Sequence, residues 1–196
     1  MGRPWNGWYH CIGHTYGSWL YGDPRGFRTR HHREHVDGDY RHPPAAGAYE
    51  RRLRRSIASM RFEPVALSQA DRLLVCRVIA RTLIDQGTEL IDLSVGAHHV
   101  HLIARFPRQL ACEATPTDPA NILRDGRNPI PRHLLGRAKR AASMALAGTG
   151  RKAQGHPLWA RRTKIVPIQD RAHQVTVVHY IRDHALEGAI VWSCLV

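Results

Sequence analysis

Two histidines separated by a single residue are the feature of this sequence that points most clearly to chemistry. His99 and His101 lie in the stretch GAHHVHLIARF, residues 96–106, with Val100 between them. On a β-strand the side chains at positions i and i+2 point to the same face, about 6–7 Å apart. The two imidazoles can therefore converge on one divalent metal, although such a pair also occurs as ordinary core or surface histidines. His98 must point away from them, and we expect it in a turn or at the surface.

A second pair of residues lies about 80 positions later, in the segment HYIRDH. Tyr180 and His184 are four residues apart, which places them on one face of a helix. Opposite the histidine strand they would supply a nucleophile and a third metal ligand, whereas Tyr180 alone would most often be a core or surface tyrosine. A bound cation polarises a phosphodiester and neutralises developing charge. Attack by the tyrosine oxygen then forms a covalent phosphotyrosine, which keeps the bond energy for rejoining. Mg²⁺ or Mn²⁺ suits this chemistry, and the nitrogen ligands favour Mn²⁺.

The elements that must hold these residues follow from the hydrophobic periodicity. The sequence predicts strands over 8–16, 88–97, 99–106 and 157–168, and helices over 48–60, 67–87, 130–148 and 170–188. Ser68 is expected to cap the second helix, and Gly87 and Gly188 to end the second and last ones. Residues 88–106 are predicted to form a β-hairpin, and the apolar tail after Gly188 to pack back on the body.

The order β–α–β–β–α–β followed by one more helix is typical of the split βαβ, or ferredoxin-like, pattern. It predicts an α+β protein whose antiparallel sheet carries helices on one face, with a C-terminal helix that bears Tyr180. We expect a single domain over residues 1–196, with irregular basic insertions at 17–66 and 107–129. The four cysteines lack the paired spacing of a zinc knuckle or a disulfide framework, so a zinc-stabilised structural domain is disfavoured.

The charge balance predicts a polyanionic partner. Lys and Arg number 29 against 16 Asp and Glu, a formal net charge of +13 that is almost entirely arginine. Arginine's planar guanidinium suits phosphate, so we expect nucleic-acid contacts. The candidate residues are Arg51, Arg52, Arg54, Arg55, Arg137, Arg140, Arg161 and Arg162, and the helix 130–148 is expected to expose Arg137, Lys139 and Arg140. Trp19, Tyr21 and Trp159 are candidates for base stacking, although core positions are the commoner place for such aromatics.

Membrane and secretory segments are not indicated by the sequence. It contains no apolar run of about 18 residues and no signal-peptide pattern. We therefore expect a cytoplasmic protein without a membrane partner.

Several of these motifs are similar to those of a known family. HHVHLIARF resembles the HUH motif (His, hydrophobic, His) of single-tyrosine transposases, in particular the REP-associated tyrosine transposases. HYIRDHALEGAIVW resembles the closing helix of that family, and TYGSWLYGDPRGF resembles an opening stretch found in one of its branches. Two departures are His98 in place of the usual Asn, and DHALEG in place of an Asn-Pro motif.

The resemblance implies a ferredoxin-like catalytic domain that cleaves and rejoins single-stranded, hairpin-forming DNA, often as a homodimer. Carried over by position, it makes His99 and His101 metal ligands, Tyr180 the nucleophile and His184 the third ligand borne by the helix. The leading hypothesis is thus a metal-dependent DNA strand transferase that forms a 5′-phosphotyrosine. The alternative is a non-catalytic nucleic-acid-binding protein derived from a transposase, which needs only the basic surface.

Overall fold

The structure, a computed structural model, describes residues 4–23, 27–28, 35–36, 45, 47–107, 129–150 and 155–194. Its strands are β1 (Trp8–Thr15), β2 (Phe27–Arg28), β3 (His35–Val36), β4 (Glu89–Val95), β5 (His99–Arg105), β6 (Trp159–Pro167) and β7 (Ile190–Ser193). The α-helices are α1 (Glu50–Ala58), α2 (Gln69–Asp85), α4 (Pro129–Gly148) and α5 (Arg171–Asp183); the 3-10 helices are η1 (Trp5–Gly7) and η2 (His184–Glu187). Every predicted strand and helix is present, with ends shifted by a few residues. The predicted insertion 107–129 lies almost wholly outside the described residues.

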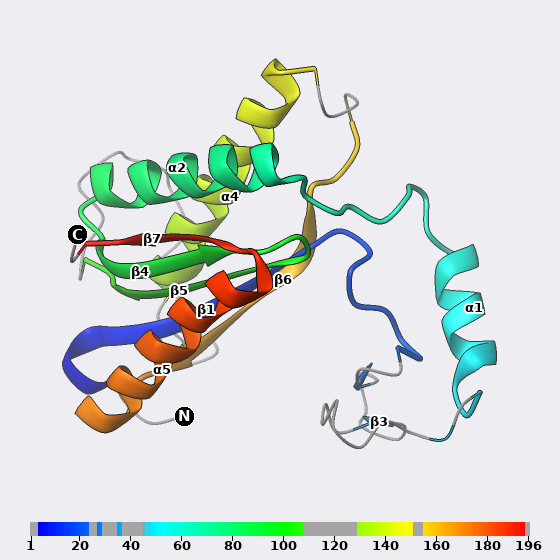
Figure 1. Cartoon of the computed structure of the whole chain (residues 1–196), viewed down its shortest axis with the longest axis horizontal. Helices are drawn as coiled ribbons and strands as arrows, with labels where there is room; N and C mark the ends of the chain where they lie inside the picture. Colours follow the sequence, from blue (N-terminus) through cyan, green and yellow to red (C-terminus); the bar gives the residue numbers. More distant parts are fainter. Residues whose placement is uncertain are drawn as a thin grey trace.

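Five strands form one antiparallel sheet in the order β6-β1-β5-β4-β7 (Figure 1). β1 lies between β5 and β6, and β4 and β5 form the predicted hairpin. The C-terminal segment was predicted only to pack back on the body, and the structure shows that it does so as strand β7, paired with β4. The protein is therefore of the α+β class with an antiparallel sheet, as predicted.

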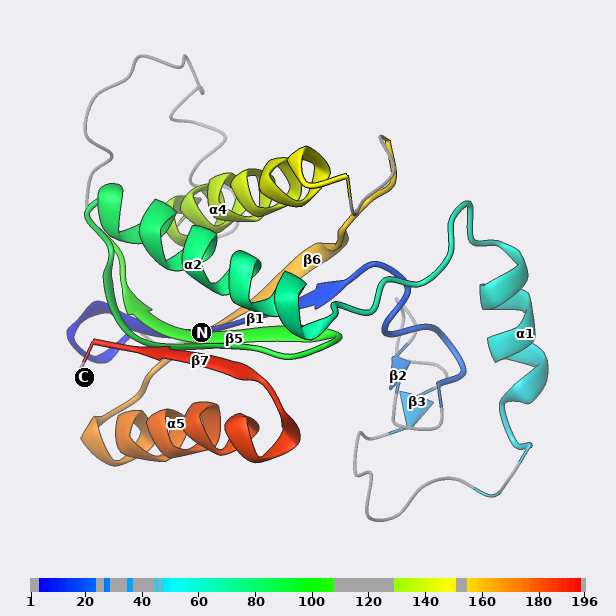
Figure 2. The same ribbon diagram turned by 45° about the horizontal axis from the view of Figure 1, so that its top comes forward.

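The helices cover both faces of this sheet (Figure 2). α2 and α4 pack on one face, and α5 packs on the other. The sequence predicted helices on one face and did not assign the C-terminal helix to a face. Because side chains alternate along a strand, consecutive residues of β5 belong to different cores. Leu102 packs in the larger cluster with α2 and α4, whereas Ile103 packs with Ile168, Val177 and Ile181 under α5. His99 and His101 share the face of Ile103 and so point toward the α5 side.

The helix ends follow the local sequence. Ser68 Oγ accepts a hydrogen bond from the Asp71 amide at 3.2 Å, and the Asp71 carboxylate accepts one from the Ser68 amide, so α2 begins with a capping box. Asp170 caps α5 by accepting from the His173 amide at 2.7 Å. Gly188, with a φ of +78°, stops η2 in the left-handed conformation and turns the chain into β7. These signals explain why α2 and α5 begin close to their predicted starts and why the chain turns at Gly188, although α5 itself ends at Asp183.

The segment between β1 and α2 extends away from the sheet, and α1 stands at its far end (Figure 1). Within this segment β2 and β3 form a small antiparallel sheet of their own. Among the described residues, no helix is long and apolar enough to cross a membrane.

Candidate metal centre and tyrosine

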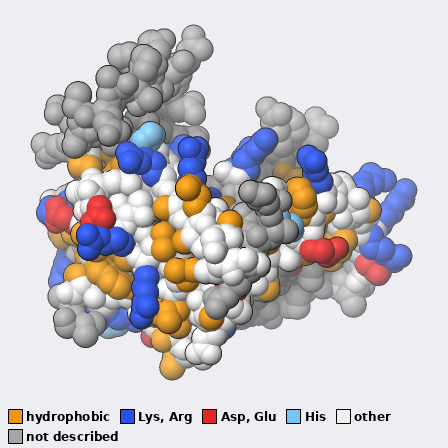
Figure 3. Space-filling model, turned by 90° about the horizontal axis from the view of Figure 1, so that it is seen from above, with side chains coloured by type: hydrophobic (Ala, Val, Ile, Leu, Met, Phe, Trp, Pro, Cys, Tyr) orange, Lys and Arg blue, Asp and Glu red, His pale blue; other side chains and the backbone are white. Residues whose placement is uncertain are grey.

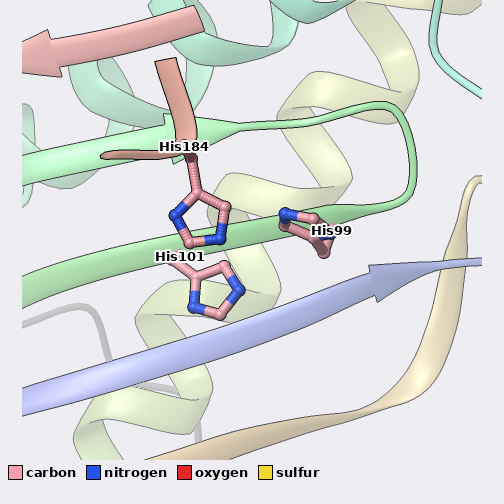
Figure 4. A group of neighbouring side chains, drawn as sticks. All are labelled: His99, His101 and His184. Carbon is pink, nitrogen blue, oxygen red and sulfur yellow. The ribbon is translucent and has the colours of Figure 1, made fainter. Parts of the chain in front are cut away.

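Three histidines meet on the α5 side of the sheet. His99 and His101 come from β5, and His184 comes from the junction of α5 and η2. Each offers a ring nitrogen, and these nitrogens all lie within 4.8 Å of one another. Figure 4 shows the three rings turned toward one another from two separate elements. The structure therefore brings together the three residues that we predicted as ligands, and His98 lies in the turn before β5, as expected.

Hydrogen bonds orient two of these rings. His184 Nδ1 lies 2.8 Å from the Tyr180 carbonyl oxygen. A carbonyl only accepts, so Nδ1 carries the proton and the lone pair of His184 is on Nε2. His101 Nδ1 lies 3.1 Å from Nε2 of His10 on β1, which leaves Nε2 of His101 for another interaction. Fixing one imidazole nitrogen so that the other is presented is how proteins commonly orient metal-ligating histidines.

His99 supplies a direct test of whether a cation fits here. Its Nε2 is buried and has no hydrogen-bond partner among the described residues. A buried polar atom without a partner is energetically costly. A metal ion shared with the neighbouring imidazoles would give this nitrogen a partner. The donor set of imidazole nitrogens is also one that divalent transition metals accept readily. The residues present therefore fit a divalent metal, held by His99, His101 and His184.

Burial keeps the imidazoles of His99, His101 and His10 neutral. Loss of solvent lowers the pKa of His99 to about 4, and the neighbouring His184 lowers it further. The same two causes hold the pKa of His101 far below its ordinary value, and burial lowers the pKa of His10 to about 4. A neutral imidazole has the lone pair that a metal needs. At neutral pH His99 and His101 therefore present lone pairs rather than positive charges.

Tyr180 lies beside the three histidines His99, His101 and His184, which we call the triad. Its ring centroid is 4.6 Å from that of His184 and 5.2 Å from that of His101. The side chain is 47% exposed, so one side of the ring faces the histidines and a substrate can reach the other. This is the arrangement that the spacing of Tyr180 and His184 predicts, now with its distances.

An ion pair fixes the helix that carries Tyr180. Asp92 on β4 is completely buried, and Arg182 donates to its carboxylate from Nε at 3.0 Å and from Nη2 at 3.3 Å. Arg182 Nη2 also donates to Ser193 Oγ on β7 at 3.2 Å. On the other side of the η2 turn, the Arg72 guanidinium donates to the Gly188 carbonyl. Tyr180 and His184 are thus held between two anchors, one on the sheet and one from α2.

Sequence reasoning missed His10 and His14. Both lie on β1, where His14 pairs with His99 and Ile12 pairs with His101, so the β1 histidines share the face of the triad. The signal was present in HCIGHT, because residues four apart on a strand share a face. It could not be used without the register and facing of β1 against β5, which the sequence does not give.

The predicted nucleic-acid contacts do not form one surface. Those on α1 are Arg51, Arg54 and Arg55, which are exposed, and Arg52, which is half-buried. Those on α4 are Arg137 and Arg140, exposed on the face of the sheet opposite the triad. On β6, Lys164 pairs with Ile12 and so shares the face of the triad. Arg161 and Arg162, also on β6, are exposed and lie where its pairing with β1 shifts register.

One expectation for α4 is wrong. Lys139 was expected at the surface, but its Nζ donates to the Ala160 carbonyl at 3.0 Å and to Thr163 Oγ1 at 3.2 Å, and burial lowers its pKa to about 8. This error comes from the close approach of α4 to β6, which helical periodicity does not reveal. Trp159 takes the core position that we considered the commoner one rather than a stacking position: it packs against the core and donates from Nε1 to the Lys139 carbonyl at 2.8 Å. Trp19 and Tyr21 are exposed, at 46% and 50%.

Comparisons with known proteins add little. No protein-family profile and no curated protein matches the sequence. A solved structure described as a REP-associated tyrosine transposase bound to a REP hairpin overlaps this chain with a TM-score of 0.42 and 11% sequence identity, covering 96% of this chain and 72% of that one. At that TM-score the overlap does not assign a family, so function must be inferred from the site itself.

Proposed function

We propose that the protein cleaves single-stranded DNA and transfers the strand, using a divalent metal and a covalent bond between Tyr180 and a 5′-phosphate. The observation that carries this proposal is the set of three histidine nitrogens within 4.8 Å of one another, with the Tyr180 ring 4.6 Å from that of His184. A metal site alone would fit many proteins. A partly exposed tyrosine directly beside it supports phosphoryl transfer to that tyrosine.

The reaction balances without any other reagent. Tyr180 Oη attacks the phosphorus, the bond from phosphorus to the 3′ oxygen breaks, and the phenolic proton ends on the departing 3′ hydroxyl. The 5′-phosphate stays on Tyr180, and a 3′ hydroxyl from a second strand reverses the step to complete the transfer. When bound, the metal would polarise the phosphate and offset the charge that develops on its oxygens.

The chain's own residues have separate roles in this scheme. His99, His101 and His184 would hold the metal, and His10 would position the ring of His101. We propose Mn²⁺ or Mg²⁺, with Mn²⁺ favoured because Mg²⁺ prefers oxygen ligands. Lys164 on β6 is exposed and shares the face of the triad, and we propose that it contacts the phosphates of the strand together with the neighbouring Arg162.

We further propose that the protein is a single-domain member of the single-tyrosine HUH transposases, with a ferredoxin-like fold and activity on hairpin-forming DNA as a homodimer. The motif resemblance supports the family. The strand order supports the fold, because β1 and β4 enclose β5, and β5 and β6 enclose β1, which is the arrangement of two interleaved split βαβ units.

A labelled hairpin-flanked single strand, incubated with the protein and Mn²⁺ and run on a denaturing gel, tests the central step. A 3′ label should travel with the protein and a 5′ label should not, because the 5′-phosphate remains on Tyr180. EDTA and Tyr180→Phe should each abolish the adduct. The matched control is Tyr9→Phe, since Tyr9 packs against Phe106 in the other core and should give the native yield.

Two results would count against the proposal. No adduct with the native protein in Mn²⁺ or Mg²⁺ would contradict catalysis, and an equal adduct with Tyr180→Phe would contradict the nucleophile. Strand binding that is unchanged in EDTA, without any adduct, would instead support the non-catalytic binding protein.

A further inference from the structure

A hollow of about 750 Å³ lies against α1, in the part of the molecule that extends away from the sheet. Two tyrosines, three arginines and serine hydroxyls line it, among them Tyr21, Tyr49, Arg51, Arg52, Arg55 and Ser59. Tyr21 is 50% exposed, and Arg51 and Arg55 are exposed as well. Its volume lies within the range of small-molecule and cofactor sites. Nothing in the proposed cleavage chemistry uses these residues.

We propose that this hollow binds an unpaired nucleotide of single-stranded nucleic acid, with the base stacked on Tyr21 and the phosphates on Arg51 and Arg55. An exposed aromatic ring offers stacking to any base that is not already stacked in a duplex. A guanidinium offers phosphate a charge and a planar pair of donors. The two features side by side select single strands over duplexes without selecting a sequence.

Charge on α1 supports a polyanionic occupant. The helix sequence is ERRLRRSIA, and its one acidic residue, Glu50, pairs with Arg54 at 2.9 Å. The arginines that line the hollow therefore give this part of the helix a net positive charge. Figure 3 shows Lys and Arg side chains gathered at the end of the molecule that carries α1.

The walls of the hollow are held together by close backbone packing. Gly22 has a φ of +92°, and a Cβ at this position would meet the Leu53 amide and, at 2.8 Å, the Tyr49 carbonyl oxygen. The residue must therefore be glycine for the Tyr21 segment to lie against α1. Ser56 Oγ adds a hydrogen bond to the Tyr21 carbonyl at 2.8 Å. Tyr21 and the arginines thus keep a fixed spacing, as a stacking and phosphate site requires.

The same segment is anchored beside the triad. The Thr15 amide, at the end of β1, donates to the His98 carbonyl at 2.9 Å. Thr15 Oγ1 donates to the Val65 carbonyl at 2.6 Å, and the Val65 amide donates to the Tyr16 carbonyl at 2.8 Å. Both ends of the extension are therefore fixed next to the turn that leads into His99. Strand binding at α1 would therefore extend the proposed function, but it does not depend on cleavage.

Fluorescence anisotropy with a short labelled single strand, in EDTA, tests the hollow without the metal centre. Tyr21→Ala should weaken binding about 10-fold, within the range measured for loss of one base–aromatic stack, and Tyr21→Phe should bind like the native protein. A blunt duplex should bind more weakly than the single strand and should not respond to Tyr21→Ala. Thermal unfolding of each variant checks that the fold is intact, since the Tyr21 side chain is half exposed.

The phosphate contacts have a matched control of equal charge. Replacing Arg51 and Arg55 by alanine should weaken binding and reduce the salt dependence by roughly one to two counterions. The double change Arg77→Ala with Arg81→Ala removes the same charge from the exposed face of α2 and should have a much smaller effect. Native affinity in Tyr21→Ala, equal losses in the two arginine pairs, or equal binding of the duplex would each overturn the proposal. Because EDTA is present throughout, the absence of a Tyr180 adduct would leave these results unaffected.

Discussion

The triad and the α1 hollow differ in the side chains that form them and in how far those side chains are buried. The triad consists of imidazoles, of which burial keeps His99 and His101 neutral, on a strand and a helix end that pack against a shared core. The hollow consists of exposed guanidiniums and a half-exposed ring on an extension away from the sheet. Chemistry at a metal needs lone pairs held at fixed distances, whereas contact with a flexible polyanion needs accessible charge. The contrast teaches that the proposed metal site and the proposed polyanion site differ in burial as well as in residue type.

The ion pairs near the two sites should therefore differ most in their effect on stability. Arg182→Leu leaves the fully buried Asp92 carboxylate without its charged partner, and should lower the free energy of unfolding by about 3–5 kcal/mol. Arg54→Leu breaks the exposed pair with Glu50, whose side chains are 73% and 57% exposed, and should cost less than about 1 kcal/mol. Urea unfolding of both variants measures the difference. Equal losses would show that the Asp92 pair is not an anchor.

Local sequence patterns were sufficient for the residues of the triad but not for its surroundings. The i, i+2 spacing of His99 and His101 and the i, i+4 spacing of Tyr180 and His184 depend only on strand and helix geometry. The contact between His10 and His101 depends on the pairing of β1 with β5. The split βαβ pattern places those strands side by side, but register and facing are set by packing between elements distant in sequence.

The α1 region shows a second limit of prediction from sequence. The helix itself was predictable from its composition, and so was its basic character. Its docking against the Tyr21 segment was not, because it depends on the positive φ of Gly22 and on a close backbone approach. Periodicity likewise could not show that Lys139 is drawn in between α4 and β6.

Acid should lower the free energy of unfolding through the histidines around the triad, and should have little effect on single-strand binding at the hollow. The pKa of His10 and of His99 is about 4 in the folded protein, against the ordinary value of 6.5. Between those values the unfolded chain binds protons that the folded protein does not. The contribution of these two histidines to the free energy of unfolding is therefore fully present above about pH 6.5 and falls as the pH drops toward 4. For His10 alone the loss between about pH 7.5 and pH 5 is about 2 kcal/mol.

Urea midpoints at those two pH values measure this loss, and His10→Gln should reduce it because one buried imidazole is removed. His179→Ala is the control, since His179 is exposed on α5. Affinity for a single strand in EDTA should change far less, because arginine stays charged throughout this range. An equal pH dependence in native protein and His10→Gln would contradict the assigned burial effect.

One added methyl group at each site gives the sharpest separation of the two sites. Gly22→Ala should separate the Tyr21 segment from α1, because its Cβ would meet backbone atoms of α1, and should weaken single-strand binding at least as much as Tyr21→Ala. The smaller effect is expected at Gly96, where a Cβ would lie 3.1 Å from His99 Nε2, so Gly96→Ala must push the ring by a few tenths of an ångström and should weaken Mn²⁺ binding roughly 5-fold, about 1 kcal/mol. Each variant should leave the other ligand's affinity unchanged, as calorimetry with Mn²⁺ and anisotropy in EDTA can show. Gly136→Ala, where a Cβ meets nothing within 4 Å, should alter neither affinity. If Gly96→Ala also weakened strand binding in EDTA, the triad and the hollow would have to be parts of one continuous site.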